Sequence, residues 1–150
     1  MIRPGLVTGI GTAALAVGCS SPVAVESPAL EGDSARLCSA LAEEAPARVA
    51  DAERRAVDTT GTALAWGDPP IVLTCGVPVP PELKPGARCD TIDTVDWFTR
   101  DGADGLVFAT IGRATTVEVR VPDDYEPAGD ALIDLGGAVR AAVPVVKRCL

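Results

Sequence analysis

The stretch Thr116-Val117-Glu118-Val119-Arg120-Val121 alternates apolar or small side chains with charged ones. A period of two is typical of a strand with one face packed on a core and the other face in water. We therefore predict a strand over 116–121, with its valines buried and Glu118 and Arg120 facing solvent. Pro122 is expected to end it, because proline has no backbone N–H to donate to a neighbouring strand.

Three more strands are expected on the N-terminal side of this one. Residues 71–75 are apolar and β-branched and lie between Pro70 and Gly76, and residues 95–99 form a similar run. Residues 106–111 follow Asp101-Gly102-Ala103-Asp104-Gly105, which has the composition of a hairpin loop because glycine accepts positive φ. Together these runs predict an antiparallel sheet of about four strands.

Helices are expected before and after the strands. Asp33 or Ser34 is suited to cap a helix that runs to about Ala45, and residues 47–55 are interpreted as a second helical piece. Near the C-terminus, Asp130 is expected to cap a helix with one apolar stripe. That stripe consists of Leu132, Leu135, Val139 and Val143. The fold class is therefore α+β: an antiparallel sheet flanked by an N-terminal and a C-terminal helix, stabilised by disulfides.

The N-terminal 32 residues are expected to lie outside the folded domain. Residues 1–18 have a positive start and a short apolar run, as in a signal peptide, and the run is too short to span a bilayer. Ala16-Val17-Gly18-Cys19 resembles the lipobox of bacterial lipoproteins, although Ala16 stands where leucine is preferred. We expect lipidation of Cys19 and anchoring at the extracytoplasmic face of the cell membrane. Residues 19–32 are interpreted as a flexible tether, with a short edge strand at 22–25 as the alternative, and residues 33–150 as a single domain.

Four cysteines remain after Cys19, and an even number in an exported chain predicts two disulfides. The chain has no histidine and no Cys-x-x-Cys spacing, so a zinc site is not expected. Three pairings are open. We favour Cys75–Cys89, which would close a proline-rich loop, and Cys38–Cys149, which would tie the first helix to the C-terminus.

Composition excludes several classes of function. The chain has 150 residues with a formal net charge of −8, which argues against nucleic acid as a partner. The absence of histidine excludes catalysis by Ser-His-Asp or Cys-His groups. No serine follows Ser39, so the body of the chain offers no serine nucleophile.

Three segments resemble a known family. They are residues 65–77, which contain Trp-Gly-Asp-Pro followed by Leu-Thr-Cys-Gly-Val, residues 95–98 and residues 117–122. They are similar to actinobacterial secreted proteins and lipoproteins catalogued as domain of unknown function 3515. The resemblance extends over roughly residues 35–150. It implies a fold and an extracytoplasmic location, and it supplies no catalytic residues.

The candidate ligand-binding residues are two tryptophans and two nearby acids, namely Trp66, Asp68, Trp97 and Asp96. The tryptophans could stack on a sugar, and the acids could form a carboxylate pair for glycan hydrolysis. The alternatives are core packing for the tryptophans and turns for the acids. Calcium is a weaker interpretation of Asp90, Asp93, Asp96, Asp101 and Asp104, because the spacing is not that of an EF-hand. We expect no cofactor and no metal.

Three functions remain open. The leading hypothesis is a non-enzymatic, lipid-anchored accessory or interaction module of the cell envelope, with an envelope protein or the cell wall as partner. The second is a binder of a small molecule, lipid or glycan. The third is a hydrolase that uses carboxylates.

Overall fold

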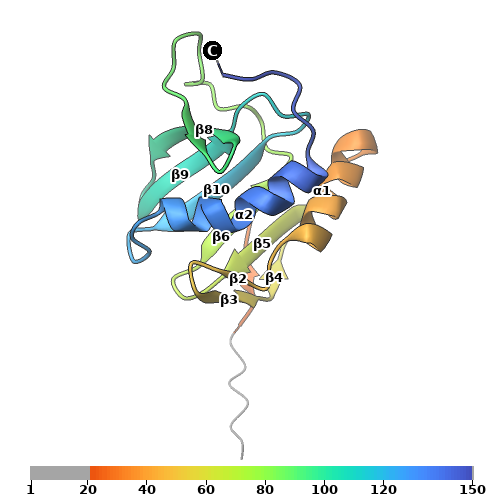
Figure 1. The fold of residues 1–150 in the computed structure, drawn as a ribbon. Coiled ribbons are helices and arrows are strands. Elements are labelled where there is room, and N and C mark those ends of the chain that lie inside the picture. Colours follow the sequence, from red (N-terminus) through yellow and green to blue (C-terminus); the bar gives the residue numbers. More distant parts are fainter. Residues whose placement is uncertain (1–20, 150) are drawn as a thin grey trace, which may run out of the picture.

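The computed structural model describes residues 21–149 and has two helices on one face of a large antiparallel sheet (Figure 1). The sheet has eight strands in the order β2-β3-β5-β6-β10-β9-β8-β7, and β1 and β4 form a separate parallel pair. The helices are α1 (Gly32–Glu44) and α2 (Gly129–Ala142). The strands are β1 (Val23–Ala24), β2 (Arg48–Val49), β3 (Ala52–Arg55), β4 (Val57–Asp58), β5 (Thr62–Trp66), β6 (Ile71–Cys75), β7 (Asp90–Ile92), β8 (Val95–Asp101), β9 (Gly105–Thr110) and β10 (Val117–Pro122).

The α+β class, the antiparallel sheet and the two flanking helices are confirmed, whereas the expected number of strands was too low. The helical piece expected over 47–55 is wrong, because this segment forms the hairpin of β2 and β3. Ala50 and Asp51 occupy its turn with φ values of 45° and 62°. Such left-handed conformations are incompatible with a right-handed helix. Within residues 21–149, no helix is long and apolar enough to cross a bilayer.

The main core lies between the sheet and the helices. Alternate residues of the central strands, among them Leu73 and Val119, point toward the helices and are fully buried. The predicted stripe of α2 is also fully buried, which confirms it; its members are Leu132, Leu135, Val139 and Val143. Asp130 lies in the first turn of α2 and is not its N-cap, which is Ala128.

The two adjacent glycines of α2 have different surroundings. A Cβ at Gly136 would lie 2.7 Å from Oδ2 of Asp93, in the turn between β7 and β8. A Cβ at Gly137 would meet nothing within 4 Å. Only Gly136 therefore allows the helix to approach this end of the sheet closely.

The opposite face of the sheet, here called the outer face, carries a second and smaller core. Val25 packs there with Ala63, Ala65 and Val72. The N–H of Val23 donates to the carbonyl of Ala56 at 2.9 Å, next to the pairing of β1 with β4. Part of the segment interpreted as a tether is therefore packed on the domain. Cys19 itself lies outside the described residues.

The two disulfides are Cys38–Cys75 and Cys89–Cys149. All four predicted cysteines are bridged, but the predicted pairing is wrong. Cys38 on α1 packs in the main core directly against the end of β6, where Cys75 lies. Cys89 precedes the edge strand β7, and the C-terminal segment returns to that edge (Figure 1).

Candidate functional site

Neither tryptophan is available to a ligand. Trp66 and Trp97 are fully buried in the main core. They lie on β5 and β8, which are separated by β6, β10 and β9. Nε1 of Trp66 donates to the carbonyl of Pro46 at 3.0 Å, while Nε1 of Trp97 is buried without an acceptor in the described part of the chain. Core packing is therefore the correct interpretation of both.

Asp96 and Asp68 do not form a carboxylate pair. Asp68 follows β5 and its side chain is exposed, with Nη1 of Arg55 at 3.5 Å. Asp96 is buried on β8. At least three strand spacings, or about 14 Å, separate β8 from the β5–β6 turn that contains Asp68. Glycoside hydrolysis uses carboxylates about 5–10 Å apart. The structure therefore does not bring these two acids together.

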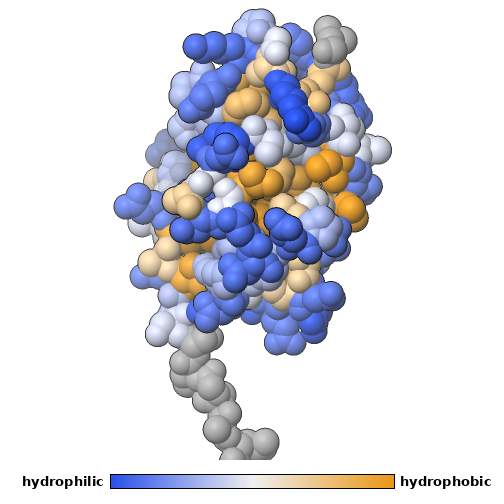
Figure 2. Space-filling model, turned by 90° about the vertical axis from the view of Figure 1, so that its left-hand side faces the viewer, coloured by the Kyte–Doolittle hydropathy of each residue, from blue (hydrophilic) through white to orange (hydrophobic). Residues whose placement is uncertain are grey.

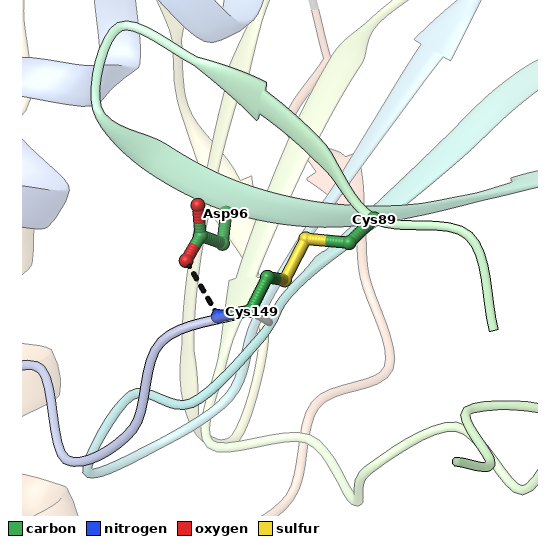
Figure 3. A group of neighbouring side chains, drawn as sticks. All are labelled: Cys89, Asp96 and Cys149. Carbon is green, nitrogen blue, oxygen red and sulfur yellow. Dashed lines mark hydrogen bonds between the residues drawn. A yellow bond between two sulfur atoms is a disulfide. The ribbon is translucent and has the colours of Figure 1, made fainter. Parts of the chain in front are cut away.

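Asp96 anchors the C-terminal segment (Figure 3). Its Oδ2 accepts the backbone N–H of Cys149 at 3.1 Å, and its Oδ1 accepts the hydroxyl of Thr91 at 2.8 Å. The sulfurs of Cys89 and Cys149 lie within 4.8 Å of this carboxylate, a spacing that could hold a metal ion. Because the two sulfurs are bonded to each other, neither is a thiolate able to act as a strong ligand. The arrangement is therefore structural in the oxidised chain.

The other predicted calcium ligands point to different partners. Asp90 pairs with Arg88 at 2.9 Å, and the carboxylate of Asp93 pairs with Arg140 on α2. Asp104 belongs instead to the wall of a hollow at the far end of β8. These acids do not converge on one point.

A hollow on the outer face has a volume of about 550 Å³. Three elements form its walls: the β5–β6 turn with Pro69 and Pro70, the β8–β9 hairpin, and the segment after β10. Val72 and Val107 contribute apolar surface. We call this site the outer-face hollow.

The charged residues of the hollow are arranged around Glu118. Its Oε2 accepts Nη2 of Arg100 at 2.9 Å and its Oε1 accepts Nε of Arg120 at 3.1 Å. Arg100, Val107, Arg120 and Val72 stand side by side on four neighbouring strands. Glu118 was predicted to face water, but only 10% of its side chain is exposed. Glu118 can be buried because two guanidinium groups replace the water that an isolated buried carboxylate would need.

Tyr125 braces one wall of the hollow. Its hydroxyl donates to the carbonyl of Pro69 at 2.8 Å, which links the segment after β10 to the β5–β6 turn. Burial, as the main cause, raises the pKa of the Tyr125 phenol. The hydroxyl therefore stays protonated, and able to donate, at neutral pH.

The outer-face hollow is not predicted by any pattern in the sequence. Arg120 lies at an outward position of the strand predicted over 116–121, whereas Arg100 lies just beyond the strand predicted over 95–99. Figure 2 shows the side of the molecule on which β8 and β9 lie, where hydrophobic residues lie among hydrophilic ones. The hollow is thus a more specific candidate than a broad apolar patch.

One comparison with known proteins gives a match. The family described as protein of unknown function (DUF3515) matches residues 5–147. No curated protein and no solved structure matches the chain. The functional assignment therefore has to come from the residues themselves.

Proposed function

Because the chain belongs to the family of proteins of unknown function DUF3515, we propose its role from its own chemistry: a lipid-anchored binding module of the cell envelope, without catalytic activity. Cys19 is the anchor, and the domain lies at the extracytoplasmic face of the membrane. The observation that carries the proposal is the short connection between Cys19 and the folded domain.

That connection leaves little room for a free tether. Nη2 of Arg55 donates to the carbonyl of Ser21 at 3.0 Å, and Nη1 donates to the carbonyl of Gly67 at 3.0 Å. Ser21 is the second residue after Cys19, and two residues span at most about 7 Å. A lipid on Cys19 would therefore hold the domain against the bilayer. Two disulfides fit this location, because they persist in oxidising compartments.

The proposal that the domain is not an enzyme rests on its candidate groups. The four cysteines are in disulfides and cannot act as thiolates. Asp96 is engaged by Cys149 and Thr91. The chain has no histidine, the side chain that most often serves as a general base near neutral pH.

Mass spectrometry of the mature protein tests the anchor. We expect an N-terminal Cys19 that carries a diacylglyceryl group, and no such modification in Cys19→Ala. Ser20→Ala is the matched control and should be lipidated like the wild type. An unmodified mature N-terminus at any other residue would contradict the proposal.

Enzyme assays test the proposal that the domain has no catalytic activity. The purified chain should show no turnover of peptidoglycan, glycosides, esters or disulfides. Turnover that is lost in Asp68→Asn or Asp96→Asn would instead support a carboxylate hydrolase.

A further inference from the structure

We propose that the outer-face hollow binds an amphiphile with a single anionic head group. Arg120 would donate to the phosphate or carboxylate of the head, with the positive charge of Arg100 beside it. Val72 and Val107 would contact the apolar part. This inference adds a ligand class to the proposed module.

Arg120 keeps donors for such a head group. Glu118 uses Nε of Arg120 and Nη2 of Arg100. Among the described residues, the terminal nitrogens of Arg120 have no hydrogen-bond partner, and its side chain is 55% exposed. Nε of Arg100 is buried and also lacks a partner there. Glu118 therefore holds both guanidinium groups in place, while donors of Arg120 stay accessible to an oxyanion.

The charge balance of the hollow favours one negative charge over several. Two arginines line it together with three carboxylates, those of Glu118, Asp104 and Asp124. The free donors of Arg120 attract an oxyanion at short range, whereas Asp104 and Asp124 repel every anion, and a polyanion more strongly than a monoanion. The chain as a whole has a net charge of −8 and adds to this repulsion.

The apolar surface favours an amphiphile over a bare anion. Val72, Val107 and Leu106 line the hollow together with three prolines, Pro69, Pro70 and Pro122. A volume of about 550 Å³ falls within the range of about 300–1,000 Å³ that is usual for ligand pockets. Such a hollow is large enough for a head group and a short length of chain.

The position of the hollow relative to Ser21 suggests where the ligand comes from. Arg55 contacts the carbonyls of Ser21 and Gly67, and Pro69 of the hollow follows Gly67 by two residues. If Cys19 is lipidated, as proposed above, the hollow lies near the bilayer surface. A lipid head group is then the nearest source, and a free anionic metabolite is the other source.

Binding to dihexanoyl-phosphatidylglycerol, a soluble monoanionic amphiphile, tests the inference by calorimetry. The full chain with Cys19→Ala is used, because it cannot be acylated and its own lipid cannot fill the hollow. A failure of the lipid-anchor proposal would therefore leave this result unaffected. Dihexanoyl-phosphatidylcholine and inorganic phosphate are the comparison probes.

We expect the phosphatidylglycerol probe to bind at least tenfold more tightly than either comparison probe. Arg120→Gln should weaken its binding about tenfold or more, since a charge-assisted hydrogen bond is lost. Glu118→Gln should strengthen it, because the amide oxygen can still accept a hydrogen bond from an arginine while the competing negative charge is removed. Arg36→Gln makes the same charge change on the exposed face of α1 and should have no effect.

Two results would overturn the inference. Equal binding of the phosphatidylcholine probe, unchanged by Arg120→Gln, would show that the arginines do not select an anion. Inorganic phosphate binding as tightly as the phosphatidylglycerol probe would show that the apolar surface contributes nothing. Arg120→Gln is expected to lower the affinity for the phosphatidylglycerol probe and Glu118→Gln to raise it. A general loss of folding would lower the affinity in both variants, so the two effects can be distinguished.

Discussion

Trp66 and Trp97 are equally buried, yet within residues 21–149 only Trp66 has a hydrogen-bond acceptor for its indole N–H. We predict that Trp66→Phe lowers the free energy of unfolding by about 1–2 kcal/mol more than Trp97→Phe. Both variants lose similar packing. Trp66→Phe also leaves the carbonyl of Pro46 without its donor, whereas Trp97→Phe removes an N–H that was buried and unpaired. Urea denaturation of the two variants measures the difference, and a larger loss for Trp97→Phe would contradict it.

At the scale of one element, the adjacent glycines Gly136 and Gly137 of α2 should respond differently to the same substitution. Gly137→Ala should raise the free energy of unfolding by about 1 kcal/mol, because alanine is the better helix former and its Cβ meets open space. Gly136→Ala should raise the free energy of unfolding clearly less than Gly137→Ala does, or should lower it. The reason is that the new Cβ would displace the carboxylate of Asp93, which pairs with Arg140. Thermal unfolding of both variants measures the difference. Equal gains would show that the turn at Asp93 adapts without cost.

Elements with a strong local pattern were predictable from the sequence. The strand at 71–75, the valines of 117–121 and the stripe of α2 follow from periodicity alone. The strand Ala52–Arg55 could not be predicted from periodicity, because its residues are mostly charged and its conformation depends on pairing with β2 and β5. The pairing of β1 with β4 was equally hidden, since the partners lie 34 residues apart and each strand has two residues.

The candidate site was less predictable than the fold. An arginine or a glutamate in an alternating strand usually faces water, and Glu118 was interpreted in that way. Its burial depends on Arg100, which lies 18 residues away on a strand that is not its direct neighbour. Only the strand order brings these residues together, and the sequence pattern does not specify that order.

At the scale of the whole molecule, the two disulfides differ in burial. Cys38 and Cys75 are fully buried, while Cys89 and Cys149 are partly exposed. Chain entropy predicts about 4 kcal/mol for each bridge, with a difference below about 0.5 kcal/mol. We therefore predict that the double variant Cys38→Ala/Cys75→Ala loses more stability than Cys89→Ala/Cys149→Ala, because it also leaves space in the core.

Peptide mapping of the unreduced protein establishes the pairing before stability is compared. It should release Cys38 linked to Cys75, and Cys89 linked to Cys149. A peptide that links Cys75 to Cys89 would contradict the structure. Denaturation with guanidinium chloride then ranks the two double variants, and an equal loss would show that burial of the first bridge has no effect.

Among the four cysteines that follow Cys19, the bridges also follow the order of synthesis, because the first pairs with the second and the third with the fourth. On the proposed export route, Cys38 and Cys75 leave the cytoplasm before Cys89 does, so the first bridge can close before a wrong partner arrives. A reduced chain that is released all at once loses this timing. In such a chain Cys75 and Cys89, 14 residues apart, meet most often, and that bridge must be undone by thiol exchange. Oxidative refolding in a test tube should therefore depend strongly on added glutathione, whereas secretion through a membrane should need far less help.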